Sequence, residues 1–357
     1  MTQYRILFIP SPVGPLGSGQ GGGVETNIIN IAPYLAQQGH KIGVIAAKGS
    51  QALAGVTIYE VEGALPPYAL HTKRNALPVV QTDGLLEHLW EKAAAIQQEY
   101  DLIVGINYDW IAYFLTPFFT TPVVHIISIS SLIDSVDQII AKRYKENPKR
   151  FAVNTKIQAE TYAFMNAETI TKLYGGVNLS TFQFSKHAEH QLCWVGRISP
   201  EKNIQDALLT ARALQLPIAI CGTIQDQEYW EKIQKEFSDV TYMYHGLLPQ
   251  EKLAKIIGNS SVFLMTSKKP LVEAFGNVTI ESLACGTPVV AYAGGGADEI
   301  IENGKSGYMV ESQQQTDFTQ AVKDAFLLDR MKVRERGEAF SLEQMAKRYV
   351  TWFDSIK

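Results

Sequence analysis

Residues 273–291 read EAFGNVTIESLACGTPVVA. An apolar strand is expected just before this stretch, ending near Met265, and a second strand is expected over 289–291. Between them lie a loop and a helix that begins near Asn277. Two strands joined by a helix are typical of a parallel sheet, because a parallel connection has to cross over the sheet.

The same alternation of strands and helices runs along the whole chain. The other expected strands are 6–9, 42–46, 56–61, 102–105, 123–127, 151–153, 192–195, 218–221, 240–244, 262–265 and 308–310. We therefore predict an α/β protein of two doubly wound, Rossmann-like domains. The predicted N-terminal domain is 1–174 and the second is 175–340, with a helix over 341–357 that packs back on the first domain. Such domains bind ligands at the carboxyl ends of their strands, so we expect a cleft there.

Composition narrows the class of protein. The chain has 357 residues, of which 46% are hydrophobic and 19% charged, as in a globular enzyme. A net charge of -4 argues against a nucleic-acid partner. No apolar run approaches the length of a membrane span, and the N-terminus does not resemble a signal peptide. The cysteines are few and unclustered, which fits a reduced compartment, so we expect a cytoplasmic protein.

The opening stretch also carries candidate binding groups. The amides of Gly276, Asn277 and Val278 lie at a helix start, where the helix dipole favours an anion. Glu273 and Glu281 can accept hydrogen bonds from hydroxyl groups of the same ligand. A sugar nucleotide has hydroxyls at both ends and phosphates between them, and so fits this arrangement. Two solvated glutamates on an ordinary helix fit the same spacing.

A second segment, WVGRISPEKN over 194–203, follows a strand and opens a helix. Arg197 and Lys202 are therefore expected at the carboxyl edge of the sheet. Two cations there can bind a diphosphate and stabilise it as a leaving group. Taken alone, such residues are more often ordinary surface residues.

A third segment, GSGQGGGVE over 17–25, lies between the first strand and the first helix. Its glycines let a ligand approach the backbone, and their amides can surround phosphates. Gly17, Gly19 and Gly22 also match G-x-G-x-x-G, so an NAD(P)-dependent oxidoreductase is an alternative. Against it, the glycines begin several residues after the strand, and the second strand ends in AAK without the acidic residue that binds a ribose.

Other polar groups have weaker signals. His187, His190 and Cys193 have metal-like spacing, but the cysteine belongs to a buried strand, and no Asp-x-Asp occurs, so we expect no metal site. His125 is expected at a strand end that faces the cleft, although a lone histidine at such a place is usually a structural group with its hydrogen bonds satisfied. A basic cluster is typical of a solvated helix face, with weak membrane-surface contact as the alternative. The cluster consists of Lys142, Arg143, Lys145, Lys149 and Arg150.

Taken together, the motifs resemble those of the retaining glycosyltransferase family 4, which has the GT-B fold. The motifs are GGVE at 22–25, QGH at 38–40, GGVN at 175–178, the Arg197–Lys202 loop, and the two glutamates of the opening stretch. The resemblance implies transfer of a hexose from a nucleotide sugar, with no metal and no other cofactor. It also implies a nucleotide sugar and a small-molecule acceptor as the binding partners.

The resemblance assigns roles to particular residues. It implies that Arg197 and Lys202 hold the diphosphate, that Glu273 holds the transferred sugar, and that His125 lies against that sugar. Glu281 would bind the ribose. The implied donor-binding set is Gly22, Gly23, Gly196, Gly246, Leu247, Phe275, Gly276, Asn277, Val278 and Glu281.

At a finer level, PVGPLGSGQGGGVE at 12–25 and NYDW at 107–110 are similar to cyanobacterial UDP-glucose:tetrahydrobiopterin glucosyltransferases. This similarity implies UDP-glucose as donor and a reduced pterin as acceptor. Because Tyr108, Asp109 and Trp110 directly follow an expected strand, an aromatic ring could stack on the pterin and Asp109 could accept its N–H groups. Packing of Tyr108 and Trp110 against the following helix is the alternative. The expected acceptor-binding set is Gly21, Asn107, Tyr108, Asp109 and Ser128. A lipid or saccharide acceptor and a non-catalytic sugar-nucleotide sensor are the alternatives.

Overall fold

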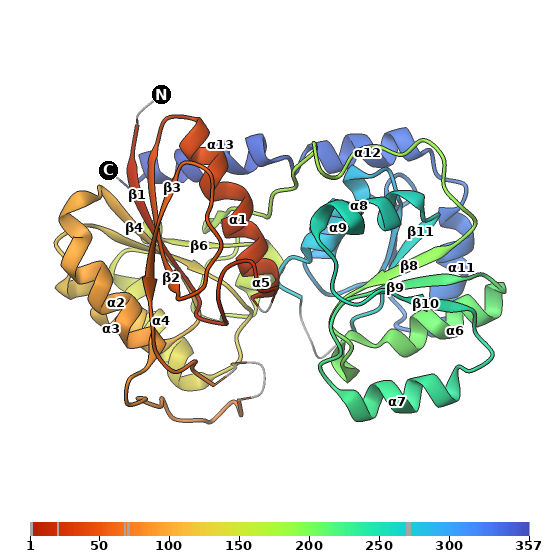
Figure 1. Ribbon diagram of the computed structural model, residues 1–357, viewed down its shortest axis with the longest axis horizontal. Helices are drawn as coiled ribbons and strands as arrows, with labels where there is room; N and C mark the ends of the chain where they lie inside the picture. The colour runs from red at the N-terminus through yellow and green to blue at the C-terminus, as the bar shows by residue number, and fades with distance from the viewer. Residues whose placement is uncertain (1–2, 20, 68, 70–71, 269–272, 357) are drawn as a thin grey trace. The chain divides into compact units, whose positions relative to one another are not determined.

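The computed structural model describes residues 3–19, 21–67, 69, 72–268 and 273–356. The chain divides into two compact units (Figure 1). The first unit is formed by Met1–Tyr174 and Leu342–Lys357, and the second by Gly175–Ser341. Each unit is built around one parallel sheet, so the predicted α/β class with two doubly wound domains is confirmed.

The first unit has a seven-stranded sheet in the order β3-β2-β1-β4-β5-β6-β7. Its strands are β1 (Arg5–Pro10), β2 (Lys41–Ala47), β3 (Val56–Val61), β4 (Leu102–Asn107), β5 (Val123–Ile127), β6 (Phe151–Val153) and β7 (Thr171–Lys172). Its helices are α1 (Gly22–Gln37), α2 (Leu85–Ile96), α3 (Trp110–Leu115), α4 (Asp134–Glu146), α5 (Lys156–Glu160) and α13 (Leu342–Asp354), with short 3-10 turns η2 (Gln97–Glu99), η3 (Thr116–Phe118) and η4 (Pro148–Arg150).

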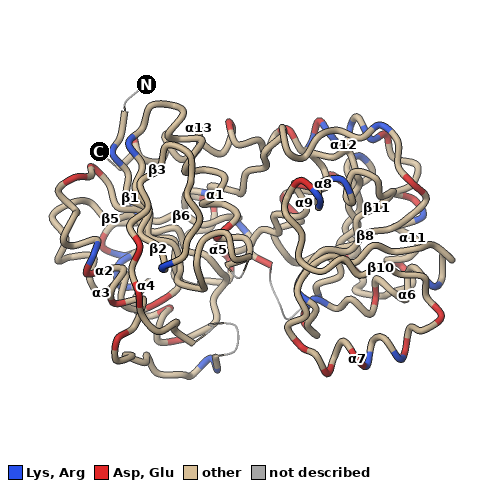
Figure 2. The backbone as a smooth tube through the Cα atoms, in the orientation of Figure 1, with Lys and Arg blue, Asp and Glu red and all other residues tan. Residues whose placement is uncertain are grey.

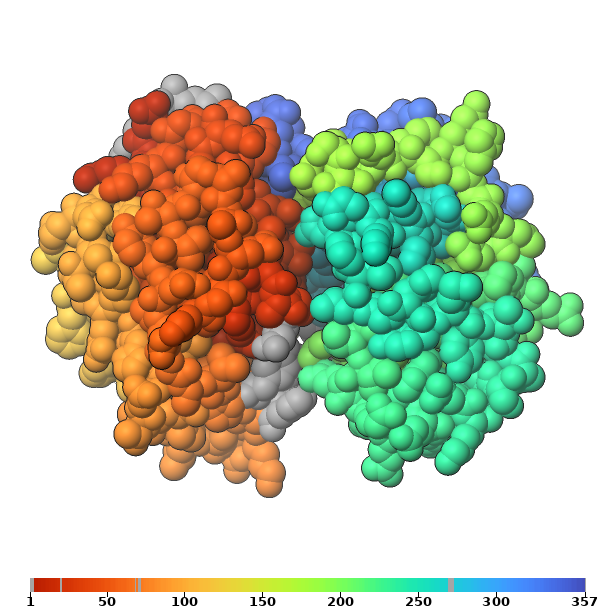
Figure 3. Space-filling model, in the orientation of Figure 1, coloured from red at the N-terminus to blue at the C-terminus, as the bar shows by residue number. Residues whose placement is uncertain are grey.

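Side chains alternate between the two faces of this sheet, as strand geometry requires. Leu7 and Ile103 belong to the core on the side of α2, α3 and α4. Phe8 and Val104 belong to the core on the opposite side, with α1 and α13. The last helix therefore packs against the first unit (Figures 1 and 3). The ring centroids of Tyr349 and Phe8 are 6.5 Å apart.

The second unit has a six-stranded sheet in the order β10-β9-β8-β11-β12-β13. Its strands are β8 (Leu192–Val195), β9 (Ile218–Cys221), β10 (Tyr242–Tyr244), β11 (Val262–Met265), β12 (Val289–Tyr292) and β13 (Gly307–Val310). Its helices are η5 (Pro200–Lys202), α6 (Ile204–Leu214), α7 (Gln227–Glu236), α8 (Gln250–Asn259), α9 (Asn277–Ala284), α10 (Ala297–Ile300), α11 (Gln315–Ala325) and α12 (Arg330–Glu338).

The strand order of each sheet reverses at one point. In the first unit this point lies between β1 and β4, and in the second between β8 and β11. Loops that leave such neighbouring strands turn away in opposite directions and open a crevice at the carboxyl ends. Each unit therefore has one favoured place for a ligand.

No helix within the described ranges is long and apolar enough to cross a membrane.

Acidic and basic residues are interleaved along α7 (Figure 2). This helix therefore has no continuous basic face.

Gly222 sets how closely the backbone packs at the carboxyl edge of the second sheet. Its φ is +134°, and an added Cβ would lie 1.9 Å from the carbonyl oxygen of Gly196. Gly222→Ala should therefore lower the free energy of unfolding by about 3 kcal/mol. Gly304→Ala, also at positive φ but with open space beside it, should cost about 1 kcal/mol. Urea unfolding followed by tryptophan fluorescence measures both, and equal losses would contradict the packing argument.

Candidate functional site

The switch point of the second sheet brings two predicted residues together. Lys202 follows β8 and Glu273 follows β11, and the Lys202 Nζ lies 2.5 Å from the Glu273 Oε2. Burial raises the pKa of the Glu273 carboxyl, but the Lys202 ammonium more than offsets this effect, so the pKa lies below its ordinary value. Residues 71 positions apart in the chain thus form one ion pair at the expected crevice.

Arg197 belongs to the same group of charges. Its positive charge also lowers the pKa of Glu273. Its Nη1 donates a hydrogen bond to the Gln225 Oε1 at 2.9 Å, and its Nη2 lies 3.9 Å from the Glu201 Oε1. Two cations and an ionised carboxylate therefore share this edge of the sheet.

The start of α9 completes this region. Gly276 has a φ of +85° and directly precedes the helix, which begins at Asn277. The Gly296 amide donates to the Glu273 carbonyl at 2.8 Å and so braces the loop ahead of the helix. Glu281 is only 6% exposed, and burial raises its pKa to about 7. Phe275 is also buried, whereas Val278 is half-buried.

Glycines line the exits of the neighbouring strands. The Gly196 amide donates to the Cys221 carbonyl at 3.0 Å, and the Gly222 amide donates to the Gly246 carbonyl at 2.8 Å. Leu247, the next residue after Gly246, is 56% exposed. Gly246 and Leu247, two members of the predicted donor-binding set, therefore lie at the same carboxyl edge as the charged group.

In the first unit, the glycine-rich loop binds an anion of its own chain. The Glu25 carboxylate is 6% exposed and accepts hydrogen bonds from the amides of Gly17 (2.6 Å), Gly19 (3.0 Å) and Gly21 (2.7 Å). The expectation that these amides surround a ligand phosphate is wrong, because their hydrogens point at Glu25. Glu25 was not among the predicted site residues, and the signal for its role is an acidic side chain two positions after the last glycine of the loop. Gly22 and Gly23 begin α1.

Asn107 and Ser128 lie at the exits of the neighbouring strands β4 and β5. The Ser128 amide donates to the Asn107 carbonyl at 3.3 Å. Asn107 is 2% exposed, and its Oδ1 and Nδ2 have no hydrogen-bond partner within the described part of the chain. Asp109 caps α3 by accepting from the Ala112 amide at 3.0 Å, and burial raises its pKa to about 6. Asn107 is the last residue of β4, Asp109 follows it by two positions, and Ser128 directly follows the neighbouring strand β5.

Tyr108 requires a correction. It is 7% exposed, and its hydroxyl accepts hydrogen bonds from the amides of Leu132 (2.9 Å) and Ile133 (2.8 Å) and donates to the Asp137 Oδ1 (2.7 Å). The ring belongs to the core between the sheet and its helices. It therefore has no free face for a flat ligand, and the stacking role predicted for it is wrong.

His125 also requires a correction. The strand that contains it continues to Ile127, so His125 is two residues short of the carboxyl edge. It is fully buried, its Nε2 lies 2.8 Å from the Thr116 Oγ1, and its ring packs against Tyr113 and Phe151. Burial, with the charges of nearby arginines, lowers its pKa to about 3, so the ring is neutral.

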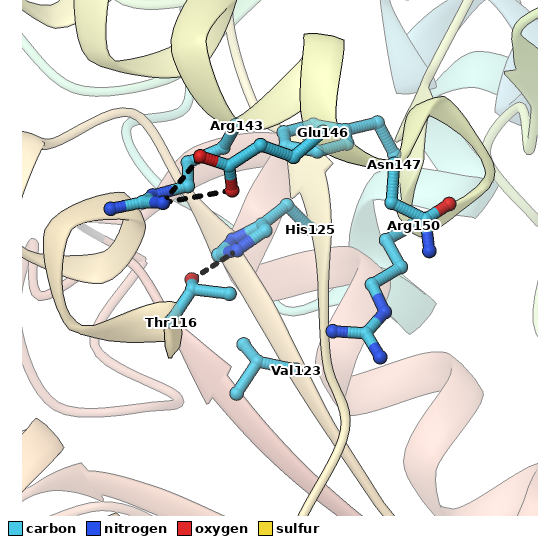
Figure 4. A pocket seen from close by; sticks show the side chains of 8 residues that line it. Thr116, Val123, His125, Arg143, Glu146, Asn147 and Arg150 are labelled. Carbon is cyan, nitrogen blue, oxygen red and sulfur yellow. Dashed lines mark hydrogen bonds and ion pairs between the residues drawn. The ribbon is translucent and has the colours of Figure 1, made fainter. Parts of the chain in front are cut away.

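The His125 side chain lines a small cavity of about 90 Å³ that also includes Arg143 and Arg150 (Figure 4). Val123 and Phe151, the first residues of β5 and β6, lie in its wall, so the cavity is at the amino ends of the strands. The expected contact between His125 and a sugar at the carboxyl ends is therefore wrong, because strand alternation turns the ring toward the helix layer.

Two further groups are the basic cluster and the residues with metal-like spacing, His187, His190 and Cys193. Lys142, Lys145 and Lys149 are exposed, and the Arg143 Nε donates to the Tyr113 carbonyl at 2.9 Å. In the second unit, burial of the Cys193 thiol raises its pKa. The described residues contain no group of three or more His, Cys, Asp and Glu side chains placed to hold a metal ion.

Comparison with known proteins identifies the class of enzyme. Residues 180–340 match the family model "Glycosyl transferases group 1". A D-inositol 3-phosphate glycosyltransferase of Nocardioides sp. is 23% identical, over 94% of this chain and 83% of that protein. Sulfoquinovosyl transferase SQD2 of Arabidopsis thaliana is 34% identical over 32% of this chain and 22% of that protein.

Solved structures show the same fold. Anabaena HepE in complex with UDP has a TM-score of 0.74 at 16% identity, covering 98% of this chain and 100% of that one. The sucrose-phosphate synthase of Thermosynechococcus elongatus has a TM-score of 0.77 at 17% identity, covering 99% of each chain. The two units therefore have the GT-B fold. The protein is a glycosyltransferase, and its residues 180–340 are the part that matches the group 1 model. This result sets the oxidoreductase alternative aside.

We expect Glu25→Gln to loosen the glycine-rich loop, because an amide offers one acceptor oxygen where the carboxylate offers two. The free energy of unfolding should fall by about 2 kcal/mol. Hydrogen exchange of the amides of Gly17, Gly19 and Gly21 should accelerate, whereas Glu91→Gln, at an exposed position of α2, should leave it unchanged. Unchanged exchange in Glu25→Gln would show that the carboxylate does not hold the loop.

Glu281 should make stability depend on pH. Its pKa is about 7 in the folded protein against an ordinary value of 4.5, so the folded state binds the proton more tightly. This contribution is fully present below about pH 4.5 and is lost as the pH rises through 7. From about pH 5 to about pH 8, the free energy of unfolding should therefore fall more in the wild type than in Glu281→Gln. Urea unfolding at both pH values tests this, and parallel losses would rule it out.

Proposed function

We propose that the enzyme transfers glucose from UDP-glucose to a small acceptor, with retention of configuration and without a metal ion. The observation that carries this proposal is the ion pair of Lys202 and Glu273 beside Arg197 at the switch point of the second sheet. Fixed cations can neutralise a departing diphosphate, the task that a divalent ion performs in other enzymes. HepE, which has the same fold, has been solved with UDP-glucose, and this supports the choice of donor.

Each group of the second unit has a role in this proposal. Arg197 and Lys202 bind the diphosphate together with the amides at the start of α9. Glu281 accepts a hydrogen bond from a ribose hydroxyl, and Glu273 accepts hydrogen bonds from hydroxyls of the glucose. Because Lys202 keeps Glu273 ionised, the carboxylate remains an acceptor at neutral pH.

The chemical step follows from these positions. The bond between the anomeric carbon and the diphosphate oxygen breaks, and negative charge collects on the diphosphate beside Lys202 and Arg197. The acceptor oxygen bonds to the anomeric carbon on the face that the diphosphate leaves, which retains the configuration. The acceptor's proton passes to the departing phosphate, so the products are the glucoside and UDP.

For the acceptor we propose a reduced pterin bound at the end of β4 in the first unit. Asp109 can accept hydrogen bonds from N–H groups, and Asn107 has both a donor and an acceptor without a partner within the described residues. A phosphorylated polyol is the second candidate, favoured by the D-inositol 3-phosphate glycosyltransferases that align along most of the chain.

The test of this function is a matrix of donors and acceptors. The purified enzyme, treated with EDTA, is incubated with UDP-glucose, ADP-glucose or GDP-mannose and with tetrahydrobiopterin or inositol 3-phosphate. Mass spectrometry should find a hexosylated pterin with UDP-glucose. If hexosylated inositol phosphate is found instead, the acceptor is the second candidate, the phosphorylated polyol, and not a pterin. Activity that needs added Mn²⁺ or Mg²⁺ would contradict the metal-independent mechanism.

Lys202→Ala should lower kcat/KM by about 10²–10³-fold, because a charge placed at the leaving group is lost. Lys232→Ala removes a charge from the exposed face of α7 and should leave turnover unchanged. Steady-state kinetics with UDP-glucose measures both, alongside urea unfolding to show that the variants are folded. Near-normal turnover of Lys202→Ala would remove this residue from the mechanism.

Asp109 should make acceptor binding depend on pH. With a pKa of about 6, it is protonated below pH 6 and then accepts N–H hydrogen bonds poorly, so the acceptor KM should rise as the pH falls. In Asp109→Asn, which still caps α3, the KM should be high at every pH while UDP affinity is unchanged. A wild-type KM that does not change between pH 5 and 8, near this pKa, would exclude Asp109 from the acceptor site.

A further inference from the structure

The turn that carries Lys202 is attached to the end of a neighbouring strand. Thr266 directly follows β11 and is 1% exposed. Its hydroxyl donates a hydrogen bond to the Lys202 carbonyl oxygen at 3.0 Å. The same hydroxyl accepts a hydrogen bond from the Trp194 Nε1 at 2.9 Å.

One hydroxyl group makes both hydrogen bonds, one as acceptor and one as donor. The indole N–H of Trp194 can only donate, so it occupies an acceptor position of the Thr266 hydroxyl. The single hydroxyl proton is therefore directed to the Lys202 carbonyl. Trp194 lies in β8, the strand that leads into the Lys202 turn, so Thr266 connects β11 with both ends of this segment.

Asn203 adds a second attachment. Its Nδ2 donates to the Thr266 carbonyl oxygen at 3.2 Å. Its φ is +50°, a left-handed conformation that asparagine tolerates better than most residues. This residue ends η5 and immediately precedes α6, so the turn is fixed where the chain changes direction.

The position of the Lys202 backbone matters because the side chain has four rotatable bonds and a point charge at its end. The Lys202 ammonium forms an ion pair with Glu273, at 2.5 Å, and the Lys202 backbone carbonyl accepts a hydrogen bond from Thr266. Both partners follow β11. The lysine is therefore placed relative to the same strand exit that supplies the carboxylate.

We propose that Thr266 is a positioning residue that places the Lys202 ammonium for the donor diphosphate. This inference rests on the proposed function, in which Lys202 binds that diphosphate. Thr266 itself does not touch the ligand, and it acts through the Lys202 carbonyl and through Asn203. The alternative is that Thr266 only satisfies the buried Trp194 N–H and contributes stability alone.

Three substitutions separate these two roles. Thr266→Val removes the hydroxyl and both of its hydrogen bonds, whereas Thr266→Ser keeps them. Trp194→Phe removes the indole N–H but leaves the bond from Thr266 to Lys202, so it is the matched control for a purely structural effect. Asn203→Gly keeps the left-handed turn and removes only the bond to the Thr266 carbonyl.

The affinity for UDP is measured by calorimetry and turnover of UDP-glucose by steady-state kinetics, for folded variants as judged by circular dichroism. Thr266→Val should lower kcat/KM for the donor by about 10–100-fold and weaken UDP binding, with an unchanged acceptor KM. Thr266→Ser and Trp194→Phe should stay within about threefold of the wild type. Asn203→Gly should lower kcat/KM by about tenfold, which keeps the test open if Thr266→Val does not fold.

A double-mutant cycle decides the outcome. In a Lys202→Ala background, Thr266→Val should have no further effect on UDP affinity, because the group that it positions is gone. An equal loss in both backgrounds, or equal losses in Thr266→Val and Trp194→Phe, would overturn the positioning role while the proposed function stands. If Lys202→Ala binds UDP as the wild type does, or the wild type does not bind UDP, the proposed function fails and this inference fails with it.

Discussion

The ion pair between Lys202 and Glu273 is the interaction on which the proposed function of the second unit depends. It joins the exits of β8 and β11, the two strands between which the sheet changes direction. An ionised carboxylate and an ammonium are costly to bury apart, and here each makes the other stable at a largely buried position. The pair thus holds, before any ligand binds, one cation suited to a diphosphate and one anion suited to sugar hydroxyls.

The charged side chains at the two switch points have different partners. In the second unit Gly196 and Gly222 lie at the strand exits without side chains, and Lys202 and Glu273 form an ion pair near the same edge. In the first unit the glycine-rich loop already surrounds the carboxylate of Glu25. The hydrogen bonds to Glu25 already use the amides of Gly17, Gly19 and Gly21. The loop cannot surround the pyrophosphate of a dinucleotide with the same amides, which gives a physical reason why the G-x-G-x-x-G spacing misleads here.

The sequence predicted most of the fold because parallel strands are short apolar runs with little ambiguity. Twelve strands were expected and found near their predicted places, and the two-residue β7 was missed because it has too few residues for a pattern. Lys202 and Glu273 could be placed because each lies in the segment between the carboxyl end of a strand and the next α-helix. Tyr108 and His125 could not, because the direction of a side chain depends on the exact register and end of its strand. Contacts such as Thr266 with Lys202 join distant segments, and no local pattern reveals them.

A crystal structure of the protein with UDP-glucose is the most direct test of this account. In that structure the Lys202 Nζ and the Arg197 guanidinium should lie within hydrogen-bond distance of diphosphate oxygens. Glu273 should accept hydrogen bonds from hydroxyls of the glucose, and Glu281 should accept one from a ribose hydroxyl. A structure in which the nucleotide binds away from the exits of β8 and β11, with Lys202 bonded to Glu273 alone, would contradict this account.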